Sequence, residues 1–552
     1  MQFLVFDLET TGLDKTKDKI ILIGYKINNH ISDIIIPNEN SESWNLFFSY
    51  LKDENILKVG HNIMFDIGFL EEKGCTVSGP IFDTMIAYYQ KYPFKQHGLK
   101  QILEKEFKQD VVELEDLCWE ERLILNKKGK LKRKRIKISI EEAYKLYPKL
   151  FEGYCLQDVE GTFKLFNLLK NDVSSWCENI EFPLIRCISD IQNNGMKLDI
   201  EKLKALRIDL EKNILRIRNN YSINLNSPKQ VGKLLLQGEH GDKLKNFLTP
   251  KKQISTGKLA LIRLGEEEIL SYRESSKLLN TYVVPMLDSD ILRGHFNQCG
   301  TITGRISSSK PNLQNIPTRT ELGGRIRKCI IPREAYNFIV ADYSQIEPRL
   351  LAHFSGDKKW SNIFILHEDF HSFVTRERFK KKEINKNERF IGKTVGLATV
   401  YGASVSRLFD VLTSAKVDVT INDVSNIRSQ IINGFPDLFS WIDRFNKRTG
   451  NSGIIKTIGG RLISLPRDRY INFVNYLIQA SASDIMKLGL LNLYHAGFKI
   501  LSTIHDEVII EVKKEDTLNS IKEIKDIMEN SFKLPAIPII VDIKSCINWG
   551  EK

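Results

Sequence analysis

The stretch ILSTIHDEVIIEV (500–512) places two adjacent carboxylates, Asp506 and Glu507, between two runs rich in Ile and Val. This pattern predicts a β-hairpin with the carboxylates at its tip. A second apolar run, in FIVADYSQIE (338–347), ends at Asp342. Carboxylates at two strand ends can meet on one sheet surface and hold two divalent ions. Such ions activate an attacking oxygen and stabilise a leaving one in phosphoryl transfer. The alternative is that each carboxylate is an ordinary turn or capping residue.

A further acidic group lies near the start of the chain, where Asp7 and Glu9 stand at the end of an apolar run in FLVFDLETTGLD (3–14). The chain as a whole is basic, with a formal charge of +12 and a pI near 9.0. A basic balance favours a polyanionic partner, although many basic proteins bind nothing anionic. The acidic groups are therefore local features that need an explanation of their own.

A third element, RFIGKTVGLATVYG (389–402), sets four side chains at intervals of four residues, so they follow one face of a predicted helix. Two of them are cations one turn apart, Arg389 and Lys393, and Leu397 and Tyr401 continue the stripe. An Arg fork and a Lys point charge match a triphosphate. The alternative is a solvated helix with a scattered basic face.

Size and composition favour a multidomain globular protein. With 552 residues the chain is long enough for two to four domains, and its 42% hydrophobic and 27% charged residues are typical of folded proteins. No stretch is long and apolar enough to predict a membrane span, and the first residues resemble a strand rather than a secretory signal. Eight cysteines without a CxxC pair suggest neither a zinc site nor a disulfide framework, and a reduced, cytosol-like compartment follows.

The order of apolar patterns predicts an α/β domain followed by a helix-rich one. Residues 1–90 alternate strand-like and helical runs, whereas 203–221 is typical of a long amphipathic helix and SPKQ (227–230) of a helix start. The basic run NKKGKLKRKRIKIS (126–139) is most simply a solvated loop, with a nucleic-acid contact as the alternative.

Four motifs together resemble those of family A DNA polymerases of the bacterial DNA polymerase I type, in the form without a 5′ nuclease domain. DYSQIEPRLLAHFSGD (342–357), RFIGKTVGLATVYG and IHDEV (504–508) resemble motifs A, B and C. TGRISSSKPNLQNIPTR (303–319) is similar to the template–primer binding segment. The matches follow the family's order over most of 180–552.

The resemblance assigns roles to residues. The catalytic metal ligands would be Asp342 and Asp506, helped by the Tyr343 carbonyl, with Glu507 nearby. Glu347 would be the steric gate that excludes a ribose 2′-hydroxyl. The nucleotide site would comprise Tyr343, Gln345, Glu347, His371, Arg389, Lys393, Leu397 and Tyr401. Primer and template would be contacted by Arg305, Asn312, Gln314, Asn315, Arg319, Asn475, Gln479 and His505, since minor-groove acceptors report correct pairing without reading sequence.

The N-terminal acidic group resembles the DEDD proofreading nucleases. FDLETTGLD (6–14), GHNIMFD (60–66) and YCLQD (154–158) are similar to their three motifs. The resemblance implies that four carboxylates bind two metals and that a tyrosine orients the attacking water: Asp7, Glu9, Asp66, Asp158 and Tyr154. The alternative is an inert exonuclease-like fold.

The expected architecture is α/β and α+β: an RNase H-like exonuclease domain (1–180) followed by a right-hand polymerase (181–552). Its thumb would span about 200–290, its palm about 291–360 and 459–552, and its fingers about 361–458. The expected ion is Mg²⁺, two per site, with Mn²⁺ as a substitute, because all-oxygen ligands and substrate phosphates suit it.

The expected partners are primer–template DNA, deoxynucleotides and, in the exonuclease site, a single-stranded 3′ end. The protein would be monomeric and cytoplasmic, with no membrane association and an unknown processivity factor. The positions that depart from the family pattern include Pro348, Leu397 and Ile471. The rival functions are a nuclease whose polymerase half only binds DNA, and a non-enzymatic DNA-binding scaffold.

Overall fold

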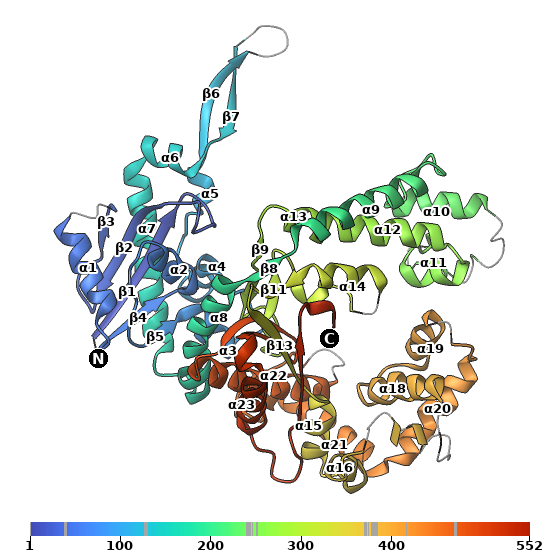
Figure 1. Ribbon diagram of the computed structural model, residues 1–552. Helices are drawn as coiled ribbons and strands as arrows, with labels where there is room; N and C mark the ends of the chain where they lie inside the picture. Colours follow the sequence, from blue (N-terminus) through green and yellow to red (C-terminus); the bar gives the residue numbers. More distant parts are fainter. Residues whose placement is uncertain are drawn as a thin grey trace. The chain divides into compact units, whose positions relative to one another are not determined.

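The computed structural model describes residues 2–37, 41–125, 131–238, 244, 247–249, 252–318, 320–368, 372–373, 375–376, 383, 385–415, 417–467 and 472–551, without the side chains of 123–125, 131–132, 386–387 and 393 (Figure 1). The chain forms two compact units. Unit 1 comprises Met1–Asp190, Gln298–Gly304 and Lys456–Leu465, and unit 2 comprises Ile191–Asn297, Arg305–Ile455 and Pro466–Lys552.

Unit 1 is built on a five-stranded mixed sheet in the order β3-β2-β1-β4-β5. β1 pairs antiparallel with β2 and parallel with β4, so the strand that carries the first acidic pair lies in the middle of the sheet. Its strands are β1 (Gln2–Thr10), β2 (Ile20–Ile27), β3 (Asp33–Ile35), β4 (Ile56–Gly60) and β5 (Ile81–Asp83). Its helices include α1 (Glu42–Lys52), α2 (Met64–Glu72), α3 (Thr84–Lys91), α4 (Leu99–Phe107), α5 (Leu114–Leu117), α6 (Ile140–Leu146) and α7 (Pro148–Leu169).

Helix α7 packs closely on the sheet because one strand position lacks a side chain. A Cβ atom at Gly24 would lie 2.7 Å from Val159 Cγ2 and 2.8 Å from Cys155 Sγ. Contacts that short do not occur between real side chains, so only glycine permits this approach. The close packing brings the middle of α7 directly against β1 and β2.

Over residues 131–137 the basic segment is a strand and not the solvated loop that we expected. The structure has an antiparallel hairpin, β6 (Trp119–Leu125) with β7 (Leu131–Lys137), and residues 126–130 lie outside the described part. The expectation was wrong because backbone pairing alone makes this hairpin. Most side chains of β7 are charged, so no alternation of apolar residues marks the strand.

Two later segments of the chain complete unit 1. The side-chain amide of Gln298 donates to the carboxylate of the buried Glu181 (3.0 Å), and Arg461 donates to the Thr303 carbonyl (3.0 Å). The Tyr89 hydroxyl donates to the Thr301 carbonyl (2.7 Å). The division that we expected at residue 180 stays a prediction, whereas the compact unit continues to Asp190 and includes these distant segments.

Unit 2 contains a four-stranded antiparallel sheet in the order β16-β17-β13-β18. The expected hairpin over 500–512 is confirmed, because β16 and β17 pair across a tip at His505 and Asp506. The strands are β13 (Tyr336–Tyr343), β16 (Lys499–Ile504), β17 (Glu507–Lys513) and β18 (Val541–Cys546). Shorter strands of unit 2 are β8 (Met196–Leu198), β9 (Ile291–Leu292), β10 (His295–Asn297), β11 (Ser307–Ser309) and β12 (Ile330–Ile331). Strand β14 (Ile454–Lys456) ends in the segment that belongs to unit 1, and β15 (Leu462–Ser464) lies within that segment.

Helices make up most of the rest of unit 2. They include α9 (Ile200–Arg218), α10 (Pro228–Gln237), α11 (Lys258–Leu264), α12 (Glu267–Leu278), α14 (Glu321–Lys328), α15 (Ile346–Ser355), α16 (Lys358–Ile365), α18 (Lys386–Val400), α19 (Val405–Ser414), α20 (Ile421–Gly434), α21 (Pro436–Ser452), α22 (Phe473–His495) and α23 (Thr517–Asn530). The long helix expected over 203–221 is confirmed as α9, and Ser227 caps α10 by accepting from the Gln230 backbone.

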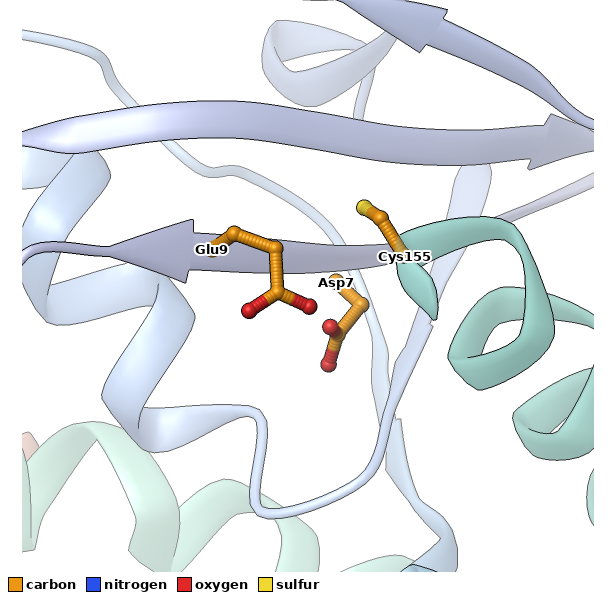
Figure 2. A group of neighbouring side chains, drawn as sticks. All are labelled: Asp7, Glu9 and Cys155. Carbon is orange, nitrogen blue, oxygen red and sulfur yellow. The ribbon is translucent and has the colours of Figure 1, made fainter. Parts of the chain in front are cut away.

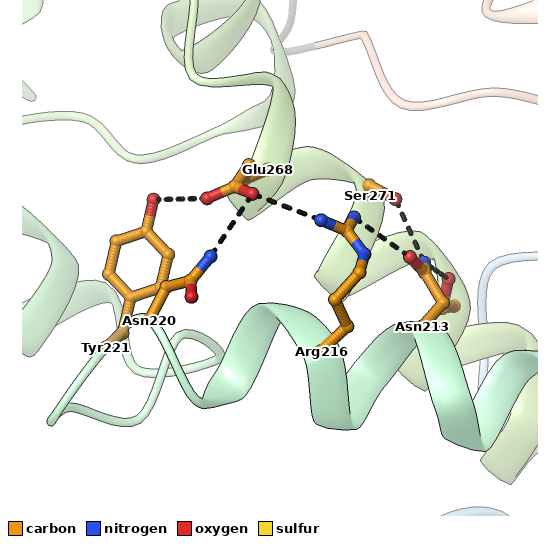
Figure 3. Close-up of polar contacts among 7 residues, drawn as sticks. Asn213, Arg216, Asn220, Tyr221, Glu268 and Ser271 are labelled. Atoms are coloured by element: carbon orange, nitrogen blue, oxygen red, sulfur yellow. Dashed lines mark hydrogen bonds and ion pairs between the residues drawn. The ribbon is translucent and has the colours of Figure 1, made fainter.

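A polar seam joins α9 to α12 (Figure 3). The Asn213 amide donates to the hydroxyls of Ser271 (3.1 Å) and Ser275 (2.9 Å). One turn beyond the end of α9, the Tyr221 hydroxyl donates to Glu268 (3.2 Å). These directional bonds fix the rotation of one helix against the other, which apolar packing alone specifies less sharply.

Among the described residues, no helix is long and apolar enough to cross a membrane.

Asp83, at the junction of β5 and α3, provides a stability test for unit 1. Its buried carboxylate accepts from the backbone N–H groups of Asn62, Ile63, Met85 and Ile86 at 2.8–3.2 Å. Replacing it by alanine leaves these donors without an acceptor. We expect Asp83→Ala to lower the free energy of unfolding by about 3 kcal/mol or more, measured on the thermal or denaturant transition that includes unit 1. The exposed Asp110→Ala is the control. Equal stability of the two variants would contradict the capping role.

Candidate active sites

The four predicted nuclease carboxylates come together in unit 1. Asp7 and Glu9 are two residues apart on β1, so their side chains leave the same face of the strand. Asp66, in the first turn of α2, accepts from the Leu8 backbone N–H (3.0 Å), which ties that helix to the strand between the two acids. Asp158, on α7, lies close enough to raise the pKa of both β1 carboxylates.

A cysteine that the sequence did not single out belongs to this cluster. The thiol of Cys155 and the carboxylates of Asp7 and Glu9 each offer a ligand atom, and these atoms lie within 4.8 Å of one another (Figure 2). Cys155 precedes Asp158 by three residues on α7, so both residues face the same side of the helix. In the sequence, the three-residue spacing between Cys155 and Asp158 was the signal that could have indicated this cysteine.

Burial and mutual repulsion control the charge of the cluster. Burial, followed by the charge of Asp158, raises the pKa of Asp7 to about 8. Burial, followed by the charge of Asp7, holds the pKa values of Glu9 and Asp66 well above the ordinary range. The pKa of Tyr154 is also raised, by burial first and then by Asp158. Without added positive charge, the carboxylates therefore retain protons near neutral pH.

Lys100 supplies one such charge and was missed by the sequence reasoning. It lies on α4, is almost fully buried, and forms an ion pair with Asp158. Its ammonium group also lies 4.1 Å from the centre of the Tyr154 ring. Its charge lowers the pKa of Asp7, Glu9 and Asp158 against the effect of burial. No pattern in the sequence separated this lysine from the exposed lysines around it.

The donor set fits divalent cations. Carboxylate oxygens are the ligands that Mg²⁺ and Mn²⁺ prefer, and several of them converge here. One buried ammonium group cannot balance four acidic side chains, so the cluster gains from additional positive charge. The residues that could hold a metal are Asp7, Glu9, Asp66 and Asp158.

In unit 2, the two motif carboxylates meet at one edge of the sheet. Asp342 is next to the last residue of β13, and the N–H of its neighbour Tyr343 donates to the Asp506 carbonyl (3.0 Å). Burial raises the pKa of Asp506 to about 6, Arg305 opposes the rise, and Glu347 and Asp342 add to it. Two carboxylates at adjoining strand ends again suit a divalent cation.

Glu507 faces a different partner. It lies opposite Asp342 in the strand register, but its buried carboxylate accepts from the Trp549 indole N–H (3.1 Å). The register also places Asp542 of β18 opposite Asp342. Opposed residues share a sheet face, so Asp542 is an acidic neighbour that the motifs did not indicate.

A connected network surrounds the predicted gate residue. Arg305 donates to one oxygen of Glu347 (2.5 Å) and lies 3.7 Å from Asp506, while the Tyr401 hydroxyl donates to the other oxygen of Glu347. Burial, followed by Glu347, raises the pKa of Tyr401 well above its usual value. The Asn475 amide donates to the Tyr401 carbonyl (3.2 Å). The structure thus joins residues from four separated motifs.

Helix α18 carries the predicted triphosphate-binding face. Arg389 is exposed and its Nε donates to Ser372 (3.3 Å), Leu397 is half-buried, and Tyr401 follows the end of the helix. Lys393 lies on the same helix, but its side chain is outside the described part, as are His371 and Ile471.

The predicted primer–template residues have varied environments. Gln314 donates to the Ile306 carbonyl (2.7 Å), and the Asn312 side chain accepts from the Gln314 backbone, so both hold their own loop. His505, and Gln345 of the predicted nucleotide site, adopt left-handed backbone conformations (φ 56° and 53°) at the turns beside the two carboxylates. Asn315 ends a short 3-10 turn, Gln479 is half-buried on α22, and Arg319 lies outside the described residues.

Comparisons with known proteins identify both units. The family model described as DNA polymerase family A matches residues 195–551. The chain belongs to DNA polymerase family A. The model described as 3′-5′ exonuclease matches residues 1–174. The resemblance inferred from the motifs is confirmed, and so is the expected fold class.

Curated relatives cover most of this family A chain. It is 30% identical to the DNA polymerase I of Borreliella burgdorferi over 100% of this chain and 62% of that protein. It is 27% identical to the DNA polymerase I of Synechocystis sp., over 99% of this chain and 60% of that protein. The chain therefore spans about 60% of the length of these relatives.

A solved structure shows the same fold. The POL domain of Pol1 from M. smegmatis, in complex with a DNA primer-template and dNTP, matches with a TM-score of 0.82. It is 22% identical in sequence, and the match covers 100% of this chain and 95% of that one.

The role of Lys100 can be tested without measuring activity. Lys100→Met removes the buried positive charge and leaves Asp158 without its ion-pair partner. We expect the free energy of unfolding in EDTA at pH 7 to fall by about 3 kcal/mol. We also expect Mg²⁺ or Mn²⁺ to raise the melting temperature more than in the unmodified chain, because the ion replaces the lost charge.

The matched control is Lys105→Met, which removes an exposed lysine from the same helix. Melting curves of both variants with and without metal make the comparison. If Lys100→Met is as stable as Lys105→Met in EDTA, Lys100 does not balance the cluster.

Proposed function

We propose that this chain is a template-directed DNA polymerase that adds deoxynucleotides to a primer 3′ end and removes misincorporated ones with its own 3′-5′ exonuclease. The observation that carries the proposal is that both carboxylate sets converge within units whose sequences match a polymerase and an exonuclease family. The full activity, its substrates and its partners follow from the family and from the residues at each site.

In the polymerase site, Asp342 and Asp506 would hold two divalent cations, with the Tyr343 carbonyl as an additional ligand. When bound, such ions lower the pKa of the attacking hydroxyl and neutralise charge on the phosphates. Arg389 and Lys393, one turn apart on α18, would bind the triphosphate, with His371 reaching a phosphate as well. This arrangement presents the α-phosphate to the primer end while the base pairs with the template.

Glu347 would select the sugar. Its carboxylate is held on both sides, by Arg305 and by the Tyr401 hydroxyl. A side chain fixed in this way cannot move aside for a 2′-hydroxyl at low cost, so a deoxyribose is favoured. Tyr401 would border the new base pair and Leu397 would face the sugar of the incoming nucleotide.

The rest of the motif segments would guide the DNA. Arg305, Asn312, Gln314, Asn315, Arg319, Asn475, Gln479 and His505 are the proposed contacts with primer and template. Their amide and guanidinium donors suit minor-groove acceptors and phosphate oxygens. The DNA and dNTP seen in the mycobacterial structure support this choice of partners.

In the exonuclease site, Asp7, Glu9, Asp66 and Asp158 would hold the metal ions, and the Tyr154 hydroxyl would orient the attacking water. Tyr154 precedes Asp158 by one helical turn on α7, and the nearby charge of Asp158 helps to raise its pKa. The high pKa of Tyr154 keeps that hydroxyl protonated, so it can donate to a carboxylate and position a water at the same time.

Magnesium is the proposed ion at both sites, two at each, with Mn²⁺ as a substitute. The ligands are oxygen atoms from carboxylates, a backbone carbonyl and substrate phosphates, which suit a small hard cation. The proposed location is the cytoplasm, where deoxynucleotides and reduced thiols coexist.

The two activities should separate by mutation, because their ligands come from different units. We expect Asp342→Ala to abolish primer extension and leave primer degradation, and Asp7→Ala to do the reverse. Loss of one metal-ligating carboxylate should reduce the affected rate by orders of magnitude. Labelled-primer assays with matched and mismatched ends, with and without Mg²⁺, measure both.

The exposed Asp288→Ala is the control, since it changes a carboxylate far from either motif in sequence. Near-normal extension by Asp342→Ala would refute the polymerase assignment. Near-normal degradation by Asp7→Ala would refute the exonuclease assignment.

Sugar selection can be tested with two variants. One removes the bulk of the Glu347 side chain, and the other removes only one of its hydrogen bonds. Glu347→Ala opens the space beneath the sugar and should raise the use of ribonucleotides relative to deoxynucleotides. Tyr401→Phe breaks one of the two bonds to Glu347 but keeps its carboxylate in place, so it should change the ratio far less. Single-nucleotide incorporation of dNTP and rNTP on one template gives the ratios. An unchanged ratio in Glu347→Ala would show that the residue only pairs with Arg305.

A further inference from the structure

The hairpin β6–β7 is a charged element that neither proposed site uses. It stands away from the five-stranded sheet of unit 1 (Figure 1). Nine of its nineteen residues, 119–137, are Lys or Arg and two are Glu. An isolated two-stranded hairpin is marginally stable in water, so this one depends on its anchorage at the base.

The strand register assigns the charged residues to two faces. Trp119 lies opposite Lys137, Glu121 opposite Arg135, and residue 123 opposite Arg133, so cations recur at every second position on one face. On the other face Arg122 lies opposite Lys134. Like charges directly opposed in a ladder destabilise it. Neither face gathers described apolar side chains that could offset this repulsion.

Few of these charges are neutralised within the protein. Arg122 forms ion pairs with Glu120 and Glu142, and Lys137 lies 3.6 Å from Glu115. Arg133 and Lys134 are exposed and form no ion pair with any other described residue. Unpaired cations along an exposed strand attract a polyanion.

Arg135 adds an aromatic feature to the same surface. Its guanidinium lies 5.5 Å from the centre of the ring of Trp119, which is 38% exposed. An exposed ring beside a row of cations is the combination with which proteins bind single-stranded nucleic acid, the cations to phosphates and the ring to a base or sugar. The core of an interface with a protein partner would be expected to hold fewer charged residues.

The base of the hairpin is joined to the exonuclease site. The Ile138 N–H donates to the Cys118 carbonyl (3.0 Å), and both residues belong to a small core cluster that includes Cys155. Cys155 is also the residue whose thiol lies within 4.8 Å of ligand atoms of Asp7 and Glu9. One packed cluster therefore holds both the base of the hairpin and the acidic centre.

We propose that the described strand residues of the hairpin, 119–122 and 133–137, bind the phosphodiester backbone of the single strand whose 3′ end is degraded in the exonuclease site. The inference rests on the proposed exonuclease function. Arg133, Lys134 and Arg135 contact phosphates on both faces of β7, and the Trp119 ring lies against the strand. The contacts are independent of base sequence, as proofreading requires, and they weaken with salt.

The test compares two triple variants of the full chain. Arg133→Gln, Lys134→Gln and Arg135→Gln together remove charge from the hairpin. Lys52→Gln, Lys73→Gln and Lys105→Gln remove the same charge from other exposed positions of unit 1. In degradation of a single-stranded oligonucleotide, the hairpin variant should show a KM raised by about tenfold, with kcat unchanged. The slope of log KM against log salt should fall by about 2, since each phosphate contact contributes about 0.7.

A second measurement does not depend on activity. The protein is acetylated in the presence of EDTA, and the acetylation of each lysine is measured by mass spectrometry. A single-stranded oligonucleotide should slow the acetylation of Lys134 and should not slow that of Lys52. Equal labelling of Lys134 with and without DNA, or equal KM values for the two triple variants, overturns the proposal. If duplex DNA protects Lys134 from acetylation and single-stranded DNA does not, the assignment to the single strand is overturned. Failure of the unmodified chain to degrade DNA would instead refute the exonuclease function. The two failures can be told apart, because the protection of Lys134 is measured without any degradation.

Discussion

Repulsion among buried carboxylates is the constraint on which both acidic sites depend. Bringing several of them together out of water favours their protonated forms, as the pKa of about 8 for Asp7 shows. Each site contains one basic side chain that opposes this effect. In unit 1 it is Lys100, paired with Asp158, and in unit 2 it is Arg305, beside Glu347 and Asp506. The remaining negative charge makes each site electrostatically suited to metal cations.

The backbone rather than the side chains holds these acids in place. The Leu8 N–H binds the Asp66 carboxylate, and the Tyr343 N–H binds the Asp506 carbonyl. Sheet pairing sets the positions of Asp7 and Asp342 in the same way. Because the hydrogen bonds between backbone groups do not depend on the charge state of the acids, the strand geometry persists when protons or cations enter and leave. A site built in this way is organised before its substrate arrives.

The sequence specified the acidic residues better than their surroundings. Asp342 and Asp506 could be predicted to meet because apolar runs mark strands and strand ends place side chains at one edge. The hairpin 119–137 could not be predicted, since its strands pair through the backbone and most of its described side chains remain in water. Lys100 was equally hidden, because burial of one lysine depends on how α4 packs against α7. Patterns of apolar residues report what is buried along one element, whereas contacts between elements need the fold.

The discontinuity of unit 1 has a consequence for how the protein is made. Glu181 is fully buried and accepts from Gln90, Trp176 and Gln298. The first two donors leave the ribosome before Glu181 itself, but Gln298 emerges more than a hundred residues later, and the strand β15 later still. Domains usually fold in the order of their synthesis. Here unit 1 stays incomplete while much of unit 2 is being translated, so unit 1 cannot complete its fold ahead of unit 2.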